Sequence, residues 1–347
     1  MLNHQQKEIT QAGPLLHTDG SLAQVGWMRQ PLLDCNLEAA RFYNLKFLQP
    51  LRIKRWDYYG ITTPTHFFSF TLSDIGYLNM VFAYVVDFEH KTHHEETLTL
   101  PLSKSVSLPR SSTSGVSEFS NRAVQMRFSA EHGRRLVSVQ WPAFEGSGLF
   151  ADLVLQEPEG QESMTIVIPI EARRFYYNRK INCMPASGQI TYQGKTYDIT
   201  PDKALSNLDW GRGVWAYDSS WVWASCSGFL PDGRNIGLNL GYGFGDNSAA
   251  TENAVILDGQ VHKLGQVDFS YSSKDFMQAW HMHSPDGRLE LEFNPFYERI
   301  ARTDVKLLYS EVHQIFGWYS GHFLSDCGED VILDGLAGFA EEHDARW

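Results

Sequence analysis

Short segments in which apolar and polar side chains alternate recur along this chain, and they constrain its fold more than any other feature. Residues 67–72, 79–86 and 136–141 are clear examples, rich in aromatic and β-branched side chains. Because side chains alternate between the two faces of a strand, a period of two predicts β-structure. Turn sequences such as His132-Gly133 and Asp258-Gly259 separate these segments at short intervals, which is typical of consecutive antiparallel strands. The sequence therefore predicts an all-β protein.

Helical signals are scarce by comparison. Only Leu37–Phe42 and Glu252–Val255 have the pattern of short helices, and neither is long enough to be stable by propensity alone. A chain of 347 residues is long for one small barrel and favours two domains. The alternating pattern occurs twice, so we expect an N-terminal covering arm over residues 1–50, a first β-barrel domain over 51–172 and a second over 173–347. Barrel closure or strong curvature would protect the strand edges.

Composition excludes several partners and compartments. The chain has 29 lysines and arginines against 41 aspartates and glutamates, a formal net charge of -12, so binding to nucleic acid is not expected. The longest apolar runs are far shorter than the roughly 20 residues of a transmembrane helix. The first ten residues lack the apolar core of a secretory signal, which favours a cytoplasmic location. The four cysteines are far apart in the sequence and are expected to be reduced thiols.

The segment 209–223 contains the strongest candidates for functional residues. It places Asp209, Arg212 and Asp218 among several tryptophans, although it otherwise has the pattern of a strand. Buried charges are costly unless they are paired or functional, and a solvated loop would not need so many indoles. The combination predicts a binding cleft with an aromatic floor.

Asp209 and Asp218 are candidates for a general acid or an acid/base pair. Neighbouring tryptophans would raise the pKa of such a carboxyl by desolvation. The structural alternative is an internal salt bridge between Asp209 and Arg212. Arg212 could equally hold an anionic or carbonyl group of a ligand through two hydrogen bonds. The sequence leaves both alternatives open.

An aromatic stripe accompanies these charges. Trp215, Tyr217, Trp221 and Trp223 occupy odd-numbered positions and would share one face of a strand. Such a stripe is more often part of a core than of a binding site. The charged residues and glycines in the same segment favour the binding site, because glycine lets the backbone approach a ligand closely.

Two further segments contribute candidate residues. Asp57 is a third candidate for a catalytic carboxyl, while Trp56 and Tyr58 lie on the opposite face of the same predicted strand and are candidate ligand contacts. Glu252 and Asn253 either begin a helix, where a carboxylate favours the dipole, or reach into the cleft as ligand contacts.

No metal or cofactor is expected. The pairs His281-x-His283 and His93-His94 offer metal-binding side chains, but a third ligand is not evident for either. The glycine-rich segment 241–245 is not followed by the long helix of a dinucleotide-binding fold.

Several sequence blocks, in a fixed order, are characteristic of a known family. They are Gly26-Trp27-x-Arg29-x-Pro31, Arg55–Ile61, Asp209–Trp215, Thr251–Ala254 and Glu341–Trp347. In these blocks the chain resembles the bacterial DUF2804 family, whose function is unknown, along nearly its whole length.

The order of these features is also similar to that of the tandem lipocalin-like proteins, which include carotenoid 1,2-hydratases and, more remotely, tocopherol cyclase. This resemblance implies two consecutive lipocalin-like antiparallel barrels or strongly curved sheets packed together. It also implies a carboxylate that protonates an apolar double bond near an aromatic cleft between them. By position, that proton donor would be Asp209.

The leading hypothesis is a cofactor-independent acid/base enzyme, of the hydratase, cyclase or isomerase type, acting on an apolar or amphipathic small molecule. Asp209 would donate the proton and Arg212 would tune it, while Trp56, Trp215 and Tyr217 would stabilise positive charge. A non-catalytic carrier of lipids or other hydrophobic ligands would instead have a deep apolar cavity without a carboxyl. A glycan-active protein would have two carboxylates about 5 to 10 Å apart beside a tryptophan platform in an open groove.

Overall fold

The computed structural model of this chain describes residues 6–42, 45–305 and 308–347, so residues 1–5 and 43–44 of the predicted arm lie outside the described part. Strands dominate, which confirms the prediction of an all-β protein with few short helices. Helical structure in the described ranges consists of three 3-10 segments, namely η1 (Leu37–Ala39), η2 (Lys46–Arg52) and η3 (Phe144–Gly146).

The first short helix predicted from the sequence corresponds in part to η1, but the second prediction was wrong. Ala254–Leu257 forms strand β18, which pairs with a strand on each side. Its centre is β-branched, as Val255 and Ile256, and such side chains pack better on a pleated sheet than in a helix.

Strands in the described ranges form two large antiparallel sheets. The first contains thirteen strands. Its main path runs in spatial order through β7 (Thr92–Pro101), β6 (Leu78–Asp87), β5 (His66–Asp74), β4 (Ile53–Thr62), β15 (Leu205–Val214), β13 (Arg174–Tyr192), β11 (Leu149–Gln156), β10 (Arg134–Trp141), β9 (Gln125–Glu131) and β8 (Gly115–Ser120). Beside β13 lie β12 (Met164–Glu171), β14 (Lys195–Ile199) and β2 (Gly26–Met28), the last of which pairs with β12.

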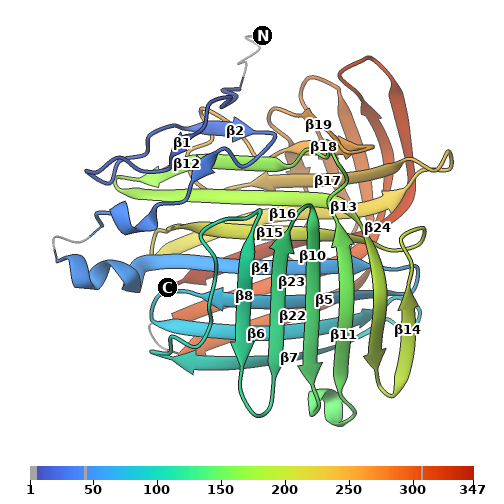
Figure 1. The fold of residues 1–347 in the computed structure, drawn as a ribbon. Coiled ribbons are helices and arrows are strands. Elements are labelled where there is room, and N and C mark those ends of the chain that lie inside the picture. Colours follow the sequence, from blue (N-terminus) through green and yellow to red (C-terminus); the bar gives the residue numbers. More distant parts are fainter. Residues whose placement is uncertain (1–5, 43–44, 306–307) are drawn as a thin grey trace.

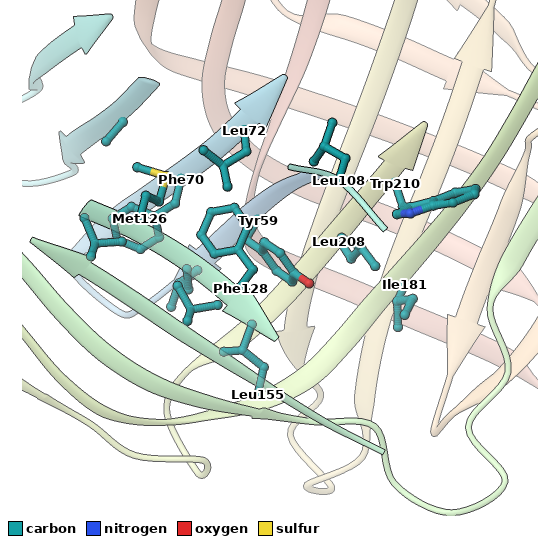
Figure 2. Close-up of a cluster of buried hydrophobic side chains, with 14 of the residues drawn as sticks. Tyr59, Phe70, Leu72, Leu108, Met126, Phe128, Leu155, Ile181, Leu208 and Trp210 are labelled. Atoms are coloured by element: carbon teal, nitrogen blue, oxygen red, sulfur yellow. The ribbon is translucent and has the colours of Figure 1, made fainter. Parts of the chain in front are cut away.

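The first sheet curls over itself. In Figure 1, the teal-to-green strands β8 to β11 cross in front of the blue-to-teal strands β4 to β7. Buried side chains from both halves fill the space between them, as Figure 2 shows for Tyr59, Phe70, Phe128 and Trp210. The rings of Tyr59 on β4 and Phe128 on β9 have centroids 5.0 Å apart. One face of β4 and β15 is therefore committed to this core.

The second large sheet has nine strands in the described ranges. In spatial order they are β19 (Gln260–Lys263), β18, β17 (Asn235–Tyr242), β16 (Asp218–Phe229), β24 (Asp330–Arg346), β23 (Leu308–Leu324), β22 (Leu289–Val305), β21 (Trp280–His283) and β20 (Asp268–Ser270). A small parallel pair, β1 (Gly13–Pro14) with β3 (Leu33–Asp34), lies apart from both. The two curled antiparallel sheets agree with the predicted lipocalin-like fold class.

Two predicted turns join neighbouring strands as the sequence indicated. His132-Gly133 connects β9 to β10, and Asp258-Gly259 connects β18 to β19. All four residues have positive φ, at 51°, 71°, 48° and 79° respectively. Two consecutive residues with positive φ match the right-handed twist of the strands that they join, which explains the glycine in each turn.

The chain leaves the first sheet at Val214, where β15 ends, and enters the second at Asp218, where β16 begins. Residues 174–214, which the sequence analysis placed in the second domain, contribute β13, β14 and β15 to the first sheet. From the predicted arm, β2 adds to the same sheet through β12. Sheet membership alone does not define a domain, so the predicted boundaries at 50 and 172 stay a prediction.

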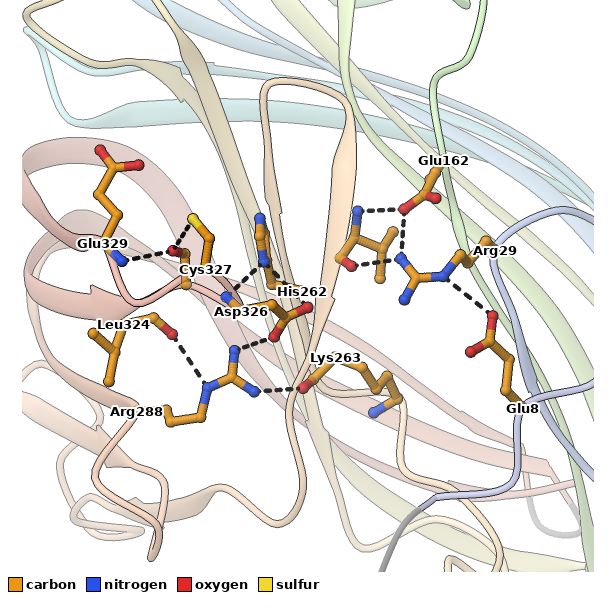
Figure 3. Close-up of polar contacts among 12 residues, drawn as sticks. Glu8, Arg29, Glu162, His262, Lys263, Arg288, Leu324, Asp326, Cys327 and Glu329 are labelled. Carbon is orange, nitrogen blue, oxygen red and sulfur yellow. Dashed lines mark hydrogen bonds and ion pairs between the residues drawn. The ribbon is translucent and has the colours of Figure 1, made fainter.

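Polar contacts connect the N-terminal segment to both sheets (Figure 3). Arg29 Nη1 lies 2.7 Å from Oε2 of Glu162, a residue just before β12. Arg29 Nε lies 3.1 Å from Glu8 Oε1. The Glu162 carboxylate also accepts a hydrogen bond at 2.7 Å from the backbone N–H of Val261 on β19. The two contacts of Glu162 link chain segments more than 90 residues apart. None of the helices in the described ranges has the length and apolar character that a membrane span requires.

Candidate functional site

A cavity of about 720 Å³ lies between the two large sheets. Strands β4 to β7, β13 and β15 line one side, and β16, β22, β23 and β24 line the other. Because side chains alternate along a strand, β4 directs Lys54, Trp56 and Tyr58 into the cavity. Asp57 and Tyr59 point to the opposite face, toward the core of the first sheet.

Aromatic rings form one wall of the cavity. The centroid of the Trp215 ring lies 5.0 Å from that of Trp56, 5.4 Å from Trp221 and 4.5 Å from Phe244. Gly211 makes room for this wall, because a Cβ at its position would stand 1.9 Å from an atom of the Trp56 indole. The structure thus brings together three predicted ligand contacts, Trp56, Trp215 and Trp221.

Asp209 points into the cavity from β15 and is buried. Its Oδ2 lies 2.9 Å from Lys180 Nζ, and its Oδ1 accepts a hydrogen bond from Asn178 Nδ2 at 2.5 Å. The Lys180 ammonium also stands 3.6 Å from the ring centroid of Trp223. The alternative in which Asp209 pairs with Arg212 was wrong, because the cation beside Asp209 comes from the neighbouring strand β13.

Glu341 on β24 is a second buried carboxyl in the cavity wall. Burial raises its pKa from 4.5 to about 7, although Lys180 and Arg299 act in the opposite direction. Its Oε1 accepts a long hydrogen bond of 3.4 Å from Trp221 Nε1, and its Oε2 accepts one of 3.1 Å from Gln314 Nε2. A carboxyl with this pKa can both hold and release a proton at neutral pH.

Glu252 reaches the cavity from the loop before β18. Burial raises its pKa, and the nearby Asp209 contributes to the increase. A Cβ at Gly241 would stand 2.2 Å from Glu252 Oε1, so glycine provides the space for this carboxyl. Asn253, predicted with it as a ligand contact, is absent from the cavity lining and instead accepts a hydrogen bond of 2.7 Å from Gly241 N.

Two tyrosines and a histidine also contribute to the polar lining. Tyr58 and Tyr84 have hydroxyl oxygens 2.7 Å apart, and burial raises the pKa of Tyr58 well above its usual value. His343 Nε2 lies 2.8 Å from Ser310 Oγ. The His343 ring packs against that of Trp221, with the two ring centroids 4.0 Å apart. Burial lowers the pKa of His343 to about 3, so its ring is neutral at pH 7.

The predicted residues Asp57 and Arg212 lie together on the other face of the first sheet. Arg212 Nη2 is 2.9 Å from Asp57 Oδ1, and Arg212 Nη1 donates to Trp56 O at 2.7 Å. Ser117 Oγ donates to the second carboxylate oxygen of Asp57. Both charged groups are buried, and neither residue lines the cavity. This geometry gives them a structural contact away from the predicted cleft.

Asp218 and Tyr217 also lie outside the cavity lining. Asp218 begins β16 and is exposed, and Tyr217 is 40% exposed in the connection that precedes it. Strand β15 ends at Val214, so the alternation that begins at Asp209 does not continue through these two positions. Their proposed catalytic and binding roles stay predictions.

Lys54, Lys180 and Glu341 line the cavity although the sequence predicted no role for them. For two of these residues, the alternation of side chains along a strand could have predicted a place in the cavity. Lys54 has the same parity as Trp56 on its strand, and Glu341 alternates with His343 on β24. No such prediction was possible for Lys180, because its position beside Asp209 follows from the register between β13 and β15, which a local pattern does not specify.

The described residues contain no group of three or more His, Cys, Asp or Glu side chains arranged to hold a metal ion. That a cofactor is unnecessary stays a prediction.

Two curled antiparallel sheets that enclose an aromatic, carboxyl-bearing cavity define a tandem lipocalin-like β protein. The sequence identifies the group more closely. Residues 6–347 match the model of a family described as a domain of unknown function, DUF2804. The chain belongs to the DUF2804 family, as its sequence blocks predicted. No curated protein matches its sequence.

Several solved structures are similar to this chain at low sequence identity. CghA, crystallised with Sch210972, gives a TM-score of 0.56 at 10% identity over 86% of this chain and 89% of that chain. A protein from Nitrosomonas europaea, provisionally assigned as AttH, gives 0.52 at 14% identity over 84% of this chain and 92% of that chain. Kievitone hydratase from Nectria haematococca gives 0.46 at 13% identity over 85% and 88% of the two chains.

Proposed function

We propose that this protein is a cofactor-independent acid/base enzyme, of the hydratase, cyclase or isomerase type, that acts on an apolar or amphipathic small molecule. The observation that carries the proposal is Glu341, a buried carboxyl whose pKa is raised to about 7 in the wall of an aromatic cavity. A general acid is most effective when its pKa lies near the working pH. Glu341 meets that condition without a cofactor.

The contacts of the two main carboxyls favour different roles. Glu341 donates the proton in this proposal, because its two hydrogen bonds come from neutral groups, an indole and an amide. Asp209 is engaged at both oxygens by Lys180 and Asn178. Its negative charge suits stabilisation of a cationic intermediate or acceptance of a proton. This assignment moves the donor from Asp209, the residue expected from the sequence, to Glu341.

The aromatic wall supports chemistry that passes through positive charge. Protonation of a carbon–carbon double bond forms a new C–H bond and leaves a carbocation. The faces of Trp56, Trp215 and Trp221 would stabilise that cation. Loss of a neighbouring proton completes an isomerisation, attack by a second double bond followed by loss of a proton completes a cyclisation, and addition of water followed by loss of its proton completes a hydration. In each case Glu341 is reprotonated at the end of the cycle.

The competing functions agree less well with the cavity. A carrier of hydrophobic ligands needs no carboxyl at the wall, whereas Asp209, Glu252 and Glu341 all line this cavity. A glycan-active protein needs two carboxylates that are free to act on the glycosidic bond, whereas Asp209 is engaged at both oxygens by Lys180 and Asn178. The fold is compatible with a small-molecule ligand, since CghA has been crystallised with Sch210972.

The experiment begins with the molecule that co-purifies with the protein from its own cells, identified by native mass spectrometry after extraction. The protein is then incubated with that molecule in D2O, and isomerised, cyclised or hydrated products are measured by mass and deuterium content. Glu341→Gln is expected to reduce kcat by at least about 100-fold. Glu342→Gln is the matched control, because Glu342 is the next residue on β24 and lies outside the cavity lining. A folded Glu341→Gln variant with wild-type turnover would contradict the proposal.

A further inference from the structure

One corner of the cavity contains three buried hydrogen-bond donors, and two of them have no acceptor among the described residues. Lys54 on β4 is 1% exposed, and its Nζ donates to Ile75 O at 3.2 Å. The indole Nε1 atoms of Trp215 and Trp347 are buried, and neither finds an acceptor among the described residues. All three donors belong to residues that line the cavity. A buried donor left without an acceptor costs about 1 to 3 kcal/mol, so an acceptor from a ligand would be stabilised here.

These donors lie close together. Lys54 Nζ stands 5.1 Å from the ring centroid of Trp347, whose centroid is 5.8 Å from that of Trp215. Gly213 is the β15 residue directly paired with Lys54, and a Cβ at Gly213 would stand 3.1 Å from Trp215 Nε1. Lys54, Trp215 and Trp347 therefore form one group, which we call the donor corner.

The donor corner also lacks a counter-ion. Among the described residues no carboxylate lies within ion-pair distance of Lys54, and Asp74, the nearest acidic influence, pairs with Arg55 instead. Burial lowers the pKa of Lys54 to about 7, and Arg52 adds to the decrease while Asp74 opposes it. The ring of Tyr77 lies on another side, 4.8 Å from Lys54 Nζ. A bound anion would supply the missing charge partner.

We propose that the donor corner binds the carboxylate of an amphipathic ligand, whose apolar body extends along β4 toward the cavity carboxyls. This inference rests on the proposed function, since it specifies the substrate class of the same cavity. It also predicts the distance between the ligand carboxylate and Asp209. Lys54 and Tyr58 are four residues apart on β4, and Tyr58 is paired with Asp209. At about 3.3 Å per residue, the carboxylate would lie about 13 Å from Asp209.

Calorimetry with decanoate and decan-1-ol as matched probes tests this inference, because the two differ only in the head group. Wild-type protein is expected to bind decanoate at least tenfold more tightly than the alcohol. Lys54→Met is expected to remove that preference, and Lys203→Met, at an exposed lysine outside the cavity lining, is expected to keep it. Equal affinities in the wild type, no binding of decanoate, or a preference that survives Lys54→Met would each overturn the inference.

A second measurement tests Lys54 without a substitution. If the carboxylate becomes its counter-ion, the lysine takes up a proton on binding, about half a proton per decanoate at pH 7. Titrations in buffers of different ionisation enthalpy measure that number, and no uptake would contradict the role of Lys54. Both measurements are independent of turnover. Glu341→Gln is expected to retain the preference for decanoate, so failure of the proposed chemistry and failure of the donor corner can be told apart.

Discussion

Lys180 and Asp209 occupy directly paired positions on β13 and β15, and Lys180 Nζ lies 2.9 Å from Asp209 Oδ2. The same ammonium group contacts the face of Trp223. Lys180 also opposes the increase in the pKa of both Glu252 and Glu341. One buried cation therefore influences three carboxyls in the cavity, and the protonation state of the site depends on it.

The stability of this ion pair is the first prediction. Lys180→Met leaves Asp209 buried without its charge partner and is expected to reduce the free energy of unfolding by about 3 kcal/mol. The double variant Lys180→Met/Asp209→Asn removes both charges and is expected to recover much of that loss. Urea unfolding of the two single variants and the double variant measures the coupling. Strict additivity of the single effects would show that the two side chains do not interact.

The pH dependence of stability is the second prediction. The pKa of Glu341 is raised from 4.5 to about 7, so between these values the folded protein holds a proton that the unfolded chain has released. Stability from this group is complete below pH 4.5 and decreases as the pH rises toward 7. Glu341→Gln cannot release the proton. Its free energy of unfolding should therefore increase relative to wild type across this window, by up to about 3 kcal/mol.

Urea unfolding of both proteins at intervals between pH 4 and 8 measures this difference. Below pH 4.5 the difference should be constant, which provides the internal control for packing effects of the amide. A difference that stays constant up to pH 8 would show that the pKa of Glu341 is not raised in the folded protein.

The sequence could predict much of the fold and part of the site, and the reason is the range of the interactions. Alternation along one strand is local, and it correctly placed Trp56 opposite Asp57. The same rule would have separated Asp209 from Arg212, which differ in parity on β15 and face different sides of the sheet. Glu341 joins the cavity from a strand 132 residues further along the chain than Asp209. Contacts between residues so far apart in the sequence depend on how the two sheets pack. A local sequence pattern does not predict that packing.

A structural role for Arg212 is the third prediction. Arg212→Leu leaves Asp57 buried without its ion-pair partner and is expected to reduce the free energy of unfolding by about 3 kcal/mol. Because Arg212 lies outside the cavity lining, the affinity of the folded variant for decanoate should equal that of the wild type. Urea unfolding and calorimetry on the same preparation measure both quantities. Weaker decanoate binding in a fully folded sample would restore the ligand-binding role that the sequence suggested.

The space above Gly211 is the basis of the fourth prediction. A Cβ there would stand 1.9 Å from the Trp56 indole, so Gly211→Ala must displace the ring that forms part of the aromatic wall. We expect a loss of about 1 to 3 kcal/mol in the free energy of unfolding, with weaker decanoate binding. Gly265→Ala is the control, because a Cβ at Gly265 would meet no atom within 4 Å.

The cause can be isolated with a second substitution at Trp56. Trp56→Ala removes the ring that collides with the added methyl group, so Gly211→Ala should cost much less in that background than in the wild type. Urea unfolding of the four proteins in this cycle measures the coupling. An equal cost of Gly211→Ala in both backgrounds would mean that the glycine is needed for its backbone and not for the position of Trp56, and the aromatic wall would then not depend on Gly211.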